Sequence, residues 1–389
     1  MMPNYIGSSK LSRGLNIEVI EAQTALQPPG LLEHGDAWYD PAMLPLVLDR
    51  LAGDAGVSCL FNATLIDAVR TGKQVHAVVT AVRGQKLTIQ ASEFIDCTGD
   101  AELCALAGAE LMAGNEEGVH QPMTLRFTMG NGDLDRLKQE DASILRINTA
   151  DYVECGYHEA KEGALGPRIR EAINAGILAE DDLGYFQFFS VNGRPRELAF
   201  NAPRIAGLNP MDPFEMSLAY QIGREKIYRI SQFVKRYLAG FEDAYVSAIA
   251  PLMGIRESRR VVGEYVLTAE DHAACRKFPD AVAHNRYPVD IHLKSGTDYR
   301  AFPPGEWHDI PYRSLVVRGF NNLWVAGRCA SADFVAQSSI RIQPVCRAMG
   351  EAAGVAAALA AKNGDTAQGV SYDSLRSRLD LSTPAAVPE

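Results

Sequence analysis

The stretch "AGRCASADFVAQSSIRIQP", residues 326–344, joins the end of an apolar strand to the first turn of an alanine-rich helix. Pro344 suits that first turn. A helix N-terminus carries unsatisfied N–H groups and partial positive charge, so it favours an anion or an electron-rich carbonyl in front of it. A buried helix with a polar cap is the alternative, but a cap needs one polar residue and this turn has many. They are Arg328, Ser331, Gln337, Ser338, Ser339, Arg341 and Gln343.

A second segment of the same form is "FIDCTGD", residues 94–100. It predicts an apolar strand, a tight turn at Thr98, Gly99 and Asp100, and a short helix. In open α/β sheets, ligands bind beyond the carboxyl ends of strands, where small residues let a phosphate or ribose approach the backbone. A plain strand-to-helix turn explains this segment equally well.

The other patterns predict an α/β chain with a separate α+β unit in its middle, at residues 121–310. A helix after Asp40 and short strands over residues 57–96 precede this unit, and residues 1–35 show no regular pattern. The middle unit contains one long helix, from a capping box at Asp212 to Gly240. We expect three further elements: a strand over 254–268 that carries arginines, a buried strand at "NNLWVAGR", and a helix over 344–362.

Composition excludes several classes of function. The net charge is −10 and no run of Lys or Arg is present, so we expect no nucleic-acid partner. Seven cysteines form no C-x-x-C pair and no metal-spaced cluster, which predicts reduced thiols, a cytoplasmic location and no bound metal. The longest apolar segment carries Arg347 and Glu351 one turn apart, so we expect no membrane span.

Three segments carry a family resemblance. They are "FIDCTGDAELCALAGAE", "GIRESRRVVGEYVLT" followed by "RYPVDIH", and "NLWVAGRCASADFVAQSSIRIQPVCRAMGEAAGVAAAL". In this order and spacing, they resemble the FAD-dependent oxidoreductases of the glutathione-reductase-like superfamily, in particular the fumarate-reductase-like group. The similarity runs from about Asp40 to Lys362.

The resemblance implies FAD as cofactor and a glutathione-reductase-type, Rossmann-like FAD-binding domain with an inserted α+β substrate domain. By residue number, it implies a partial FAD-binding domain at 1–120, a substrate or cap domain at 121–310, and a return to the FAD-binding domain at 311–389. Thr98, Gly99 and Asp100 would lie near the adenine dinucleotide. The isoalloxazine would be lined by Gly327, Arg328, Ser339, Ile340 and Arg341.

One feature of the family is missing. Its members begin with a strand, G-x-G-x-x-G and a helix that holds the pyrophosphate, and this sequence contains no such segment. The nearest match, residues 130–135, has Asp135 where the third glycine belongs and predicts a turn. We therefore expect a truncated chain, a partner polypeptide that supplies the βαβ segment, or a remnant that no longer holds FAD, and we favour truncation.

Three residues are candidates for work on a substrate: Arg256, His120 and His292. Oxidation by a flavin needs a group that takes a proton and often a cation that orients a carboxylate. Arg256, beside Gly254, can provide that cation, while ion pairing with Glu257 and Glu264 is the alternative for the arginines of this strand. Each histidine can equally be a packing residue.

The expected function is FAD-dependent oxidation of an unknown small molecule. A carboxylate group on that molecule would suit the arginines. The alternative is a protein without activity, either a degenerate homologue or the large half of a split flavoprotein complex. Hydrolase and NTPase motifs are absent from the sequence.

Overall fold

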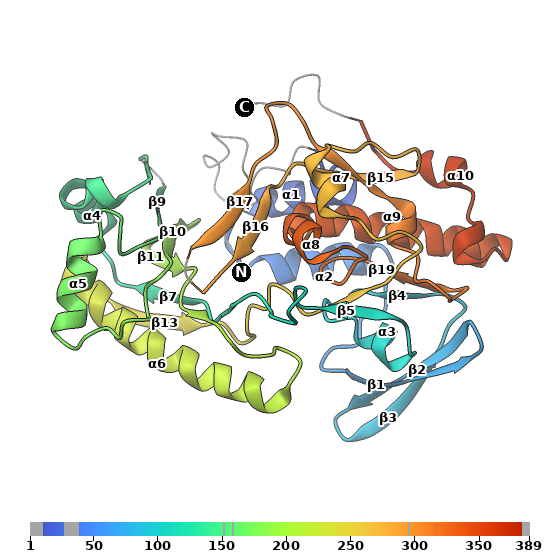
Figure 1. The fold of residues 1–389 in the computed structure, drawn as a ribbon, viewed down its shortest axis with the longest axis horizontal. Helices are drawn as coiled ribbons and strands as arrows, with labels where there is room; N and C mark the ends of the chain where they lie inside the picture. The colour runs from blue at the N-terminus through green and yellow to red at the C-terminus, as the bar shows by residue number, and fades with distance from the viewer. Residues whose placement is uncertain (1–10, 27–38, 151, 158, 295, 383–389) are drawn as a thin grey trace.

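The computed structural model describes residues 11–26, 39–150, 152–157, 159–294 and 296–382. Two bodies of packed structure are visible in Figure 1, a smaller one built around α6 and a larger one built around α9. Strands β16 (Val289–His292) and β17 (Thr297–Arg300) lie between them in this view. Buried hydrophobic residues form one cluster over 123–253 and another over 267–379.

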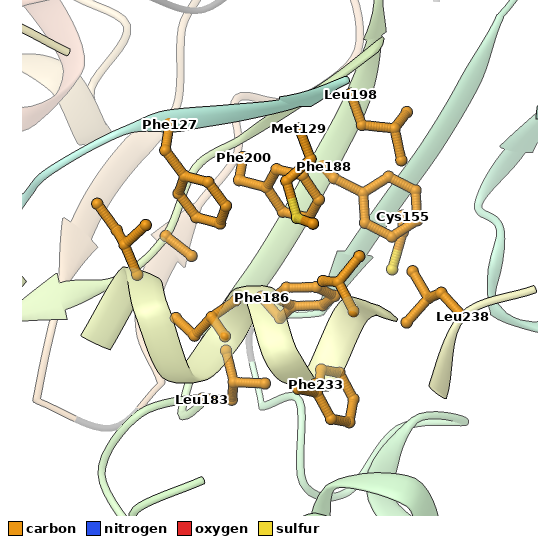
Figure 2. Packing of buried hydrophobic residues seen from close by; sticks show 14 of the residues in the cluster. Phe127, Met129, Cys155, Leu183, Phe186, Phe188, Leu198, Phe200, Phe233 and Leu238 are labelled. Atoms are coloured by element: carbon orange, nitrogen blue, oxygen red, sulfur yellow. The ribbon is translucent and has the colours of Figure 1, made fainter. Parts of the chain in front are cut away.

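The middle unit is a six-stranded antiparallel sheet with strand order β13-β7-β11-β10-β9-β8. Asp212 caps α6 (Pro213–Tyr237) by accepting from the N–H groups of Phe214 and Glu215. The helix presents Ile227, Ile230 and Phe233 to the sheet, and Figure 2 shows Phe233 packed beneath the sheet phenylalanines. The strands are β7 (Phe127–Gly130), β8 (Ile147–Asn148), β9 (Val153–Tyr157), β10 (Phe186–Val191), β11 (Arg194–Phe200) and β13 (Tyr245–Ile249). Helices α4 (Leu134–Glu140) and α5 (Gly166–Asn174) complete the unit.

The larger unit is built on α9 (Gln343–Asn363), which packs against a two-stranded parallel sheet of β4 (Phe94–Asp96) and β19 (Leu323–Val325). Alanines that recur along α9, including Ala352, Ala353 and Ala356, are fully buried, so the helix approaches its neighbours closely. Its other elements are α1 (Leu15–Leu26), α2 (Leu44–Asp54), α3 (Glu102–Leu106), α7 (Ala269–Ala273), α8 (Phe334–Ile340), α10 (Tyr372–Arg376), β15 (Ala281–Asn285) and β18 (His308–Pro311).

Small sheets flank or join the two units. A meander of β1 (Thr64–Thr71), β2 (Gln74–Val82) and β3 (Gln85–Gln90) projects from the larger unit. The pair β6 (Met123–Thr124) and β12 (Arg204–Ile205) and the pair β5 (Leu111–Ala113) and β14 (Arg259–Val261) are antiparallel. β6 and the segment from Gly254 to β14 are far apart in the sequence. These short strand pairings therefore bring together arginines from distant parts of the chain.

Several sequence expectations are confirmed. The fold is mixed α/β, the helices over 213–237 and 343–363 form, and most of the short-strand meander forms. Residues 131–133 form the bend between β7 and α4, in which Asn131 has φ +64° and Asp133 caps α4. Within the described residues, the structure contains no helix that is both long and apolar enough to cross a bilayer.

Other expectations were wrong. The segment over 1–35 contains α1, and the strand expected over 254–268 is reduced to Arg259–Val261. The polar turn after β19 contains α8, where Gln337, Ser338 and Ser339 are helical and buried. Leu267, Val282, Ala283 and Ile310 share one buried cluster with α9, and β15 packs against that helix, while the domain boundary at residue 310 stays a prediction.

Phe186 tests the core of the middle unit. Its ring is fully buried and contacts the rings of Phe188, Phe200 and Phe233. Phe186→Ala should lower the free energy of unfolding by about 3–5 kcal/mol, because it removes buried surface and leaves a cavity. Phe214→Ala, at an 84% exposed position on α6, should change it by less than about 0.5 kcal/mol. Equal changes in urea unfolding would contradict this core.

Candidate flavin and anion site

The turn after β4 is built around the buried carboxylate of Asp96. That carboxylate accepts from Thr98 N (3.0 Å), from Thr98 Oγ1 (2.7 Å) and from Cys104 N (2.9 Å). Thr98 Oγ1 also accepts from Glu102 N at 2.9 Å, so it satisfies a free N–H in the first turn of α3. Gly99 has φ +79°, a conformation that favours glycine. The turn expected from "CTGD" therefore exists, and its threonine is occupied in holding it.

The ends of β4 and β19 meet at one edge because the two strands are parallel. Arg328, three residues after β19, pairs with Asp100 at 2.9 Å and donates to Ser258 Oγ at 3.0 Å. A Cβ at position 99 would lie 2.8 Å from Arg328 Nη2, so only glycine lets the guanidinium lie against the turn. The structure thus brings together Gly99, Asp100 and Arg328, while Gly327, at φ +89°, turns the chain before the arginine.

Helix α8 holds β16 in place. Ser339 Oγ bonds Tyr287 O and accepts from Asn285 Nδ2 at 2.6 Å, and Ile340 is buried in the core. Arg341, at the end of α8, donates through Nη2 to Asp290 O at 2.9 Å and to Asp290 Oδ2 at 3.3 Å. In this arrangement Ser339 and Ile340 support the site by packing, and Arg341 is the polar group that faces β16.

Four arginines from different elements gather beside β16, and we call them the arginine site. They are Arg126 between β6 and β7, Arg204 in β12, Arg256 before β14, and Arg341 at the end of α8. Arg204 and Arg256 are buried, whereas Arg126 and Arg341 keep some exposure. Within the described ranges, Asp290 is the one carboxylate that forms an ion pair with a member, through Arg341.

Arg256 differs from its neighbours in having no acidic partner among the described residues. Its Nη1 donates to Pro122 O at 2.7 Å and to Thr124 Oγ1 at 2.6 Å. Arg259 pairs with Glu102 at 3.2 Å, and Arg260 pairs with Glu257. Burial, and then the charges of Arg341, Arg204 and Arg126, lower the pKa of Arg256 to about 9. A nearby anion would relieve both effects.

His292 is held neutral in a fixed tautomer. Its Nδ1 lies 2.5 Å from Arg204 Nη2, which can only donate, and its Nε2 lies 3.2 Å from Asp290 Oδ2, which accepts. Burial and the charge of Arg256 lower the pKa of His292 well below its usual value. Both ring nitrogens are occupied, so His292 positions Arg204 and Asp290, and no lone pair is left for a substrate proton.

His120 belongs to a different network. Its Nδ1 lies 2.8 Å from Glu257 Oε2, and Glu257 also bonds Arg260 and accepts from Gly114 N. No hydrogen bond connects His120 to the arginine site within the part of the chain that the structure describes. Sequence reasoning therefore named two histidines that the structure places apart.

Sequence reasoning missed Arg126, Arg204 and Tyr185. Arg204 lies over the Tyr185 ring, with its guanidinium carbon 4.2 Å from the ring centroid. Arg126 donates to Asn201 Oδ1 at 2.9 Å. These residues come from strand ends too short to show a periodic pattern, so the sequence carries no signal that would have distinguished them from surface arginines.

Several buried polar atoms around this site have no hydrogen-bond partner among the described residues. They are Gln121 Nε2, Arg204 Nε, Gln337 Oε1 and Arg341 Nε. Gln337 is fully buried, and its Nε2 donates to Arg256 O (3.1 Å) and to Arg328 O (3.2 Å), which joins the two arginine-bearing segments. Each unpaired group costs about 1–3 kcal/mol, and a water or a ligand with complementary groups would offset this cost.

Strand ends of a parallel pair, with a helix behind them and buried arginines beside them, are typical of mixed α/β proteins that bind an anionic ligand at the ends of their strands. The chain belongs to a family described as FAD dependent oxidoreductase, whose model matches residues 1–379. Its cofactor is FAD. No curated protein matches the sequence.

Solved structures are similar to this chain only at low identity. CmlS, a flavin-dependent halogenase, is 9% identical over 97% of this chain and 55% of its own, with a TM-score of 0.48. A geranylgeranyl bacteriochlorophyll reductase-like protein from Thermoplasma acidophilum is 12% identical over 87% of this chain and 59% of its own, with a TM-score of 0.39. This chain therefore spans less than two thirds of either structure.

The residues of the site fit a flavin. The pyrimidine edge of an isoalloxazine offers carbonyl acceptors and one N–H donor. The unpaired groups on and beside α8 include a donor, at Arg341 Nε, and an acceptor, at Gln337 Oε1. This mixture of donors and acceptors is the one that such an edge requires.

Buried neutral histidines behind α8 predict how stability depends on pH. Burial lowers the pKa of His308 to about 4, and its ring bonds Asp309 O and Asn285 Nδ2. Between pH 6.5 and 4 the unfolded chain therefore binds a proton that the folded chain does not. Through His308, the free energy of unfolding should fall by up to about 1.4 kcal/mol per pH unit as the pH drops through this window.

His308→Gln should make that dependence shallower. Urea unfolding of the wild type and the variant at pH 7.5, 6.5, 5.5 and 4.5 measures it. Parallel curves for the two proteins would show that His308 is protonated equally in the folded and unfolded states.

Proposed function

We propose that the protein oxidises or reduces a small molecule that carries a carboxylate, and that Arg256 binds this carboxylate. The observation that carries the proposal is the buried guanidinium of Arg256, which has no acidic partner among the residues that the structure describes, while both of its arginine neighbours have one. A fork of N–H donors matches the two oxygens of a carboxylate. Gln337, which bonds the backbone of Arg256 and of Arg328, places this group beside the turn proposed to line the flavin.

Other residues of the site orient the binding groups. Tyr287 holds its proton at Oη and donates it to Asp290 Oδ2 at 3.0 Å, and burial raises its pKa well above the usual value. The carboxylate of Asp290 also accepts hydrogen bonds from Arg341 and from the ring of His292. It therefore holds both side chains in position. FAD, when bound, supplies hydride transfer. The residues of this chain bind and orient the carboxylate, and neutral His292 keeps Arg204 in position.

Arg256→Gln should lower kcat/KM about tenfold to hundredfold, because it removes a buried charge-assisted contact worth roughly 1.5–3 kcal/mol. Dye-coupled turnover with a panel of small carboxylates and their amides measures it. Arg276→Gln, a half-exposed arginine paired with Asp271, serves as the matched control and should stay within about threefold. Equal losses in both variants, or a preference for the amides, would contradict the proposed role.

We also propose a glutathione-reductase-type FAD domain in which a further βαβ segment, from the same gene or a partner polypeptide, holds the pyrophosphate. Two findings support this. In the described residues β4 is paired only with β19, although parallel sheets usually have more strands and buried edges. The nearby residues Val57, Leu60 and Phe61 expose apolar side chains that a further layer would cover.

This chain alone should therefore bind FAD weakly, since a glycine loop at a helix N-terminus normally holds the pyrophosphate. Gel filtration with excess FAD, followed by absorbance at the flavin band, measures the retained cofactor. Stoichiometric retention by residues 1–389 would contradict the need for another segment.

A further inference from the structure

Arg126 and Arg204, the two members of the arginine site that come from the middle unit, bond only neutral acceptors among the described residues. Arg204 donates to Leu293 O, to Gly296 O at 2.6 Å and to Thr297 Oγ1 at 3.0 Å, besides His292. Arg126 donates to the amide oxygen of Asn201. Neither of their charges is balanced by an ion pair in the described structure.

Two buried donors next to this pair have no partner there. They are Arg204 Nε and Gln121 Nε2. Arg204 is 8% exposed and Gln121 is 2% exposed. Gln121 lies against the same strand as Arg204, because its Oε1 accepts from His292 N at 3.3 Å. N–H donors without a partner, next to a guanidinium that forms no ion pair in the described structure, are complementary to an oxyanion.

The charge of the whole site exceeds what one carboxylate balances. Arg204, Arg256 and Arg341 interact electrostatically with Asp290, and His292 is neutral, so the four guanidinium charges of the site exceed its one carboxylate charge by three. Burial lowers the pKa of Arg126 and of Arg204 to about 10, and the charge of Arg341 lowers that of Arg126 further, whereas Asp290 raises that of Arg204. Unbalanced charges in such surroundings cost several kcal/mol each, and one bound carboxylate would leave two of them.

We propose that Arg126, Arg204 and Gln121 form a second anion subsite, and that the substrate carries two anionic oxygen groups. This inference rests on the proposed function, in which Arg256 binds the first group. The middle unit then recognises one end of the substrate while the segments around α8 recognise the other. Both sets of contacts are needed for a doubly charged molecule, whereas a singly charged one uses Arg256 alone.

Three ligands with the same three-carbon acid skeleton test the subsite: butyrate, succinate and 3-phosphonopropionate. They differ only in a methyl, carboxylate or phosphonate group at the far end. Isothermal titration with the full chain and excess FAD should show that one of the doubly charged ligands binds at least tenfold more tightly than butyrate. The carboxylate and phosphonate arms identify which oxyanion the subsite accepts.

Arg126→Gln and Arg204→Gln should each abolish that preference, while butyrate affinity changes less than threefold. Arg196→Gln, an exposed arginine on β11, is the matched control and should preserve it. Because Arg204 also holds the loop at Gly296, circular dichroism and the Tm of each variant establish folding, and Arg126→Gln gives the result if Arg204→Gln unfolds.

The outcomes separate the two proposals. Equal binding of all three ligands by the wild type, or a preference that survives in Arg126→Gln, overturns the second subsite. Competition between FAD and the doubly charged ligands also overturns it, since the arginines would then hold the phosphates of the cofactor. If Arg256→Gln leaves butyrate binding unchanged while Arg126→Gln still removes the preference, the role of Arg256 fails and the second subsite stands.

Discussion

The arrangement of the site depends on an excess of positive charge between the two units. Arg126, Arg204 and Arg341 all act electrostatically on Arg256, and within the described part of the chain a single carboxylate, Asp290 of β16, pairs with one of the four. Removing a guanidinium from water is costly, and the usual solution in proteins is an acidic partner. Arg259 and Arg260 follow that rule a few residues from Arg256, which does not. The imbalance is therefore local, and the proposed anionic ligand would supply the negative charge that Arg256 lacks among the described residues.

The rest of the fold serves to hold those charges in place. α8 fixes β16 through Ser338 and Arg341 and the segment before β16 through Ser339, and Gln337 joins the backbones of Arg256 and Arg328. Behind α8, the alanine-rich α9 packs closely enough to make this wall rigid. The middle unit contributes its two arginines from strand ends on a phenylalanine-rich core. Small residues and rigid packing thus hold side chains that would otherwise repel one another.

Much of this could be predicted from the sequence, and the reasons for the failures are specific. The stripe of alanines predicted α9, the capping box at Asp212 predicted α6, and motif order predicted FAD. The polar run at 337–339 was wrongly taken for an open turn, because buried serines that bond carbonyls look the same in sequence as exposed ones. Arg126 and Arg204 could not be predicted, since they meet only through the pairing of β6 with β12, two strands of two residues each.

Anomalous diffraction from crystals soaked in bromide tests the central claim directly, because it locates anions without any knowledge of the substrate. The account predicts a strong bromide peak in contact with Arg256, and another beside Arg126 and Arg204, at soak concentrations where exposed arginines such as Arg196 show none. Bromide peaks confined to surface arginines, with none among the four of the site, would contradict it.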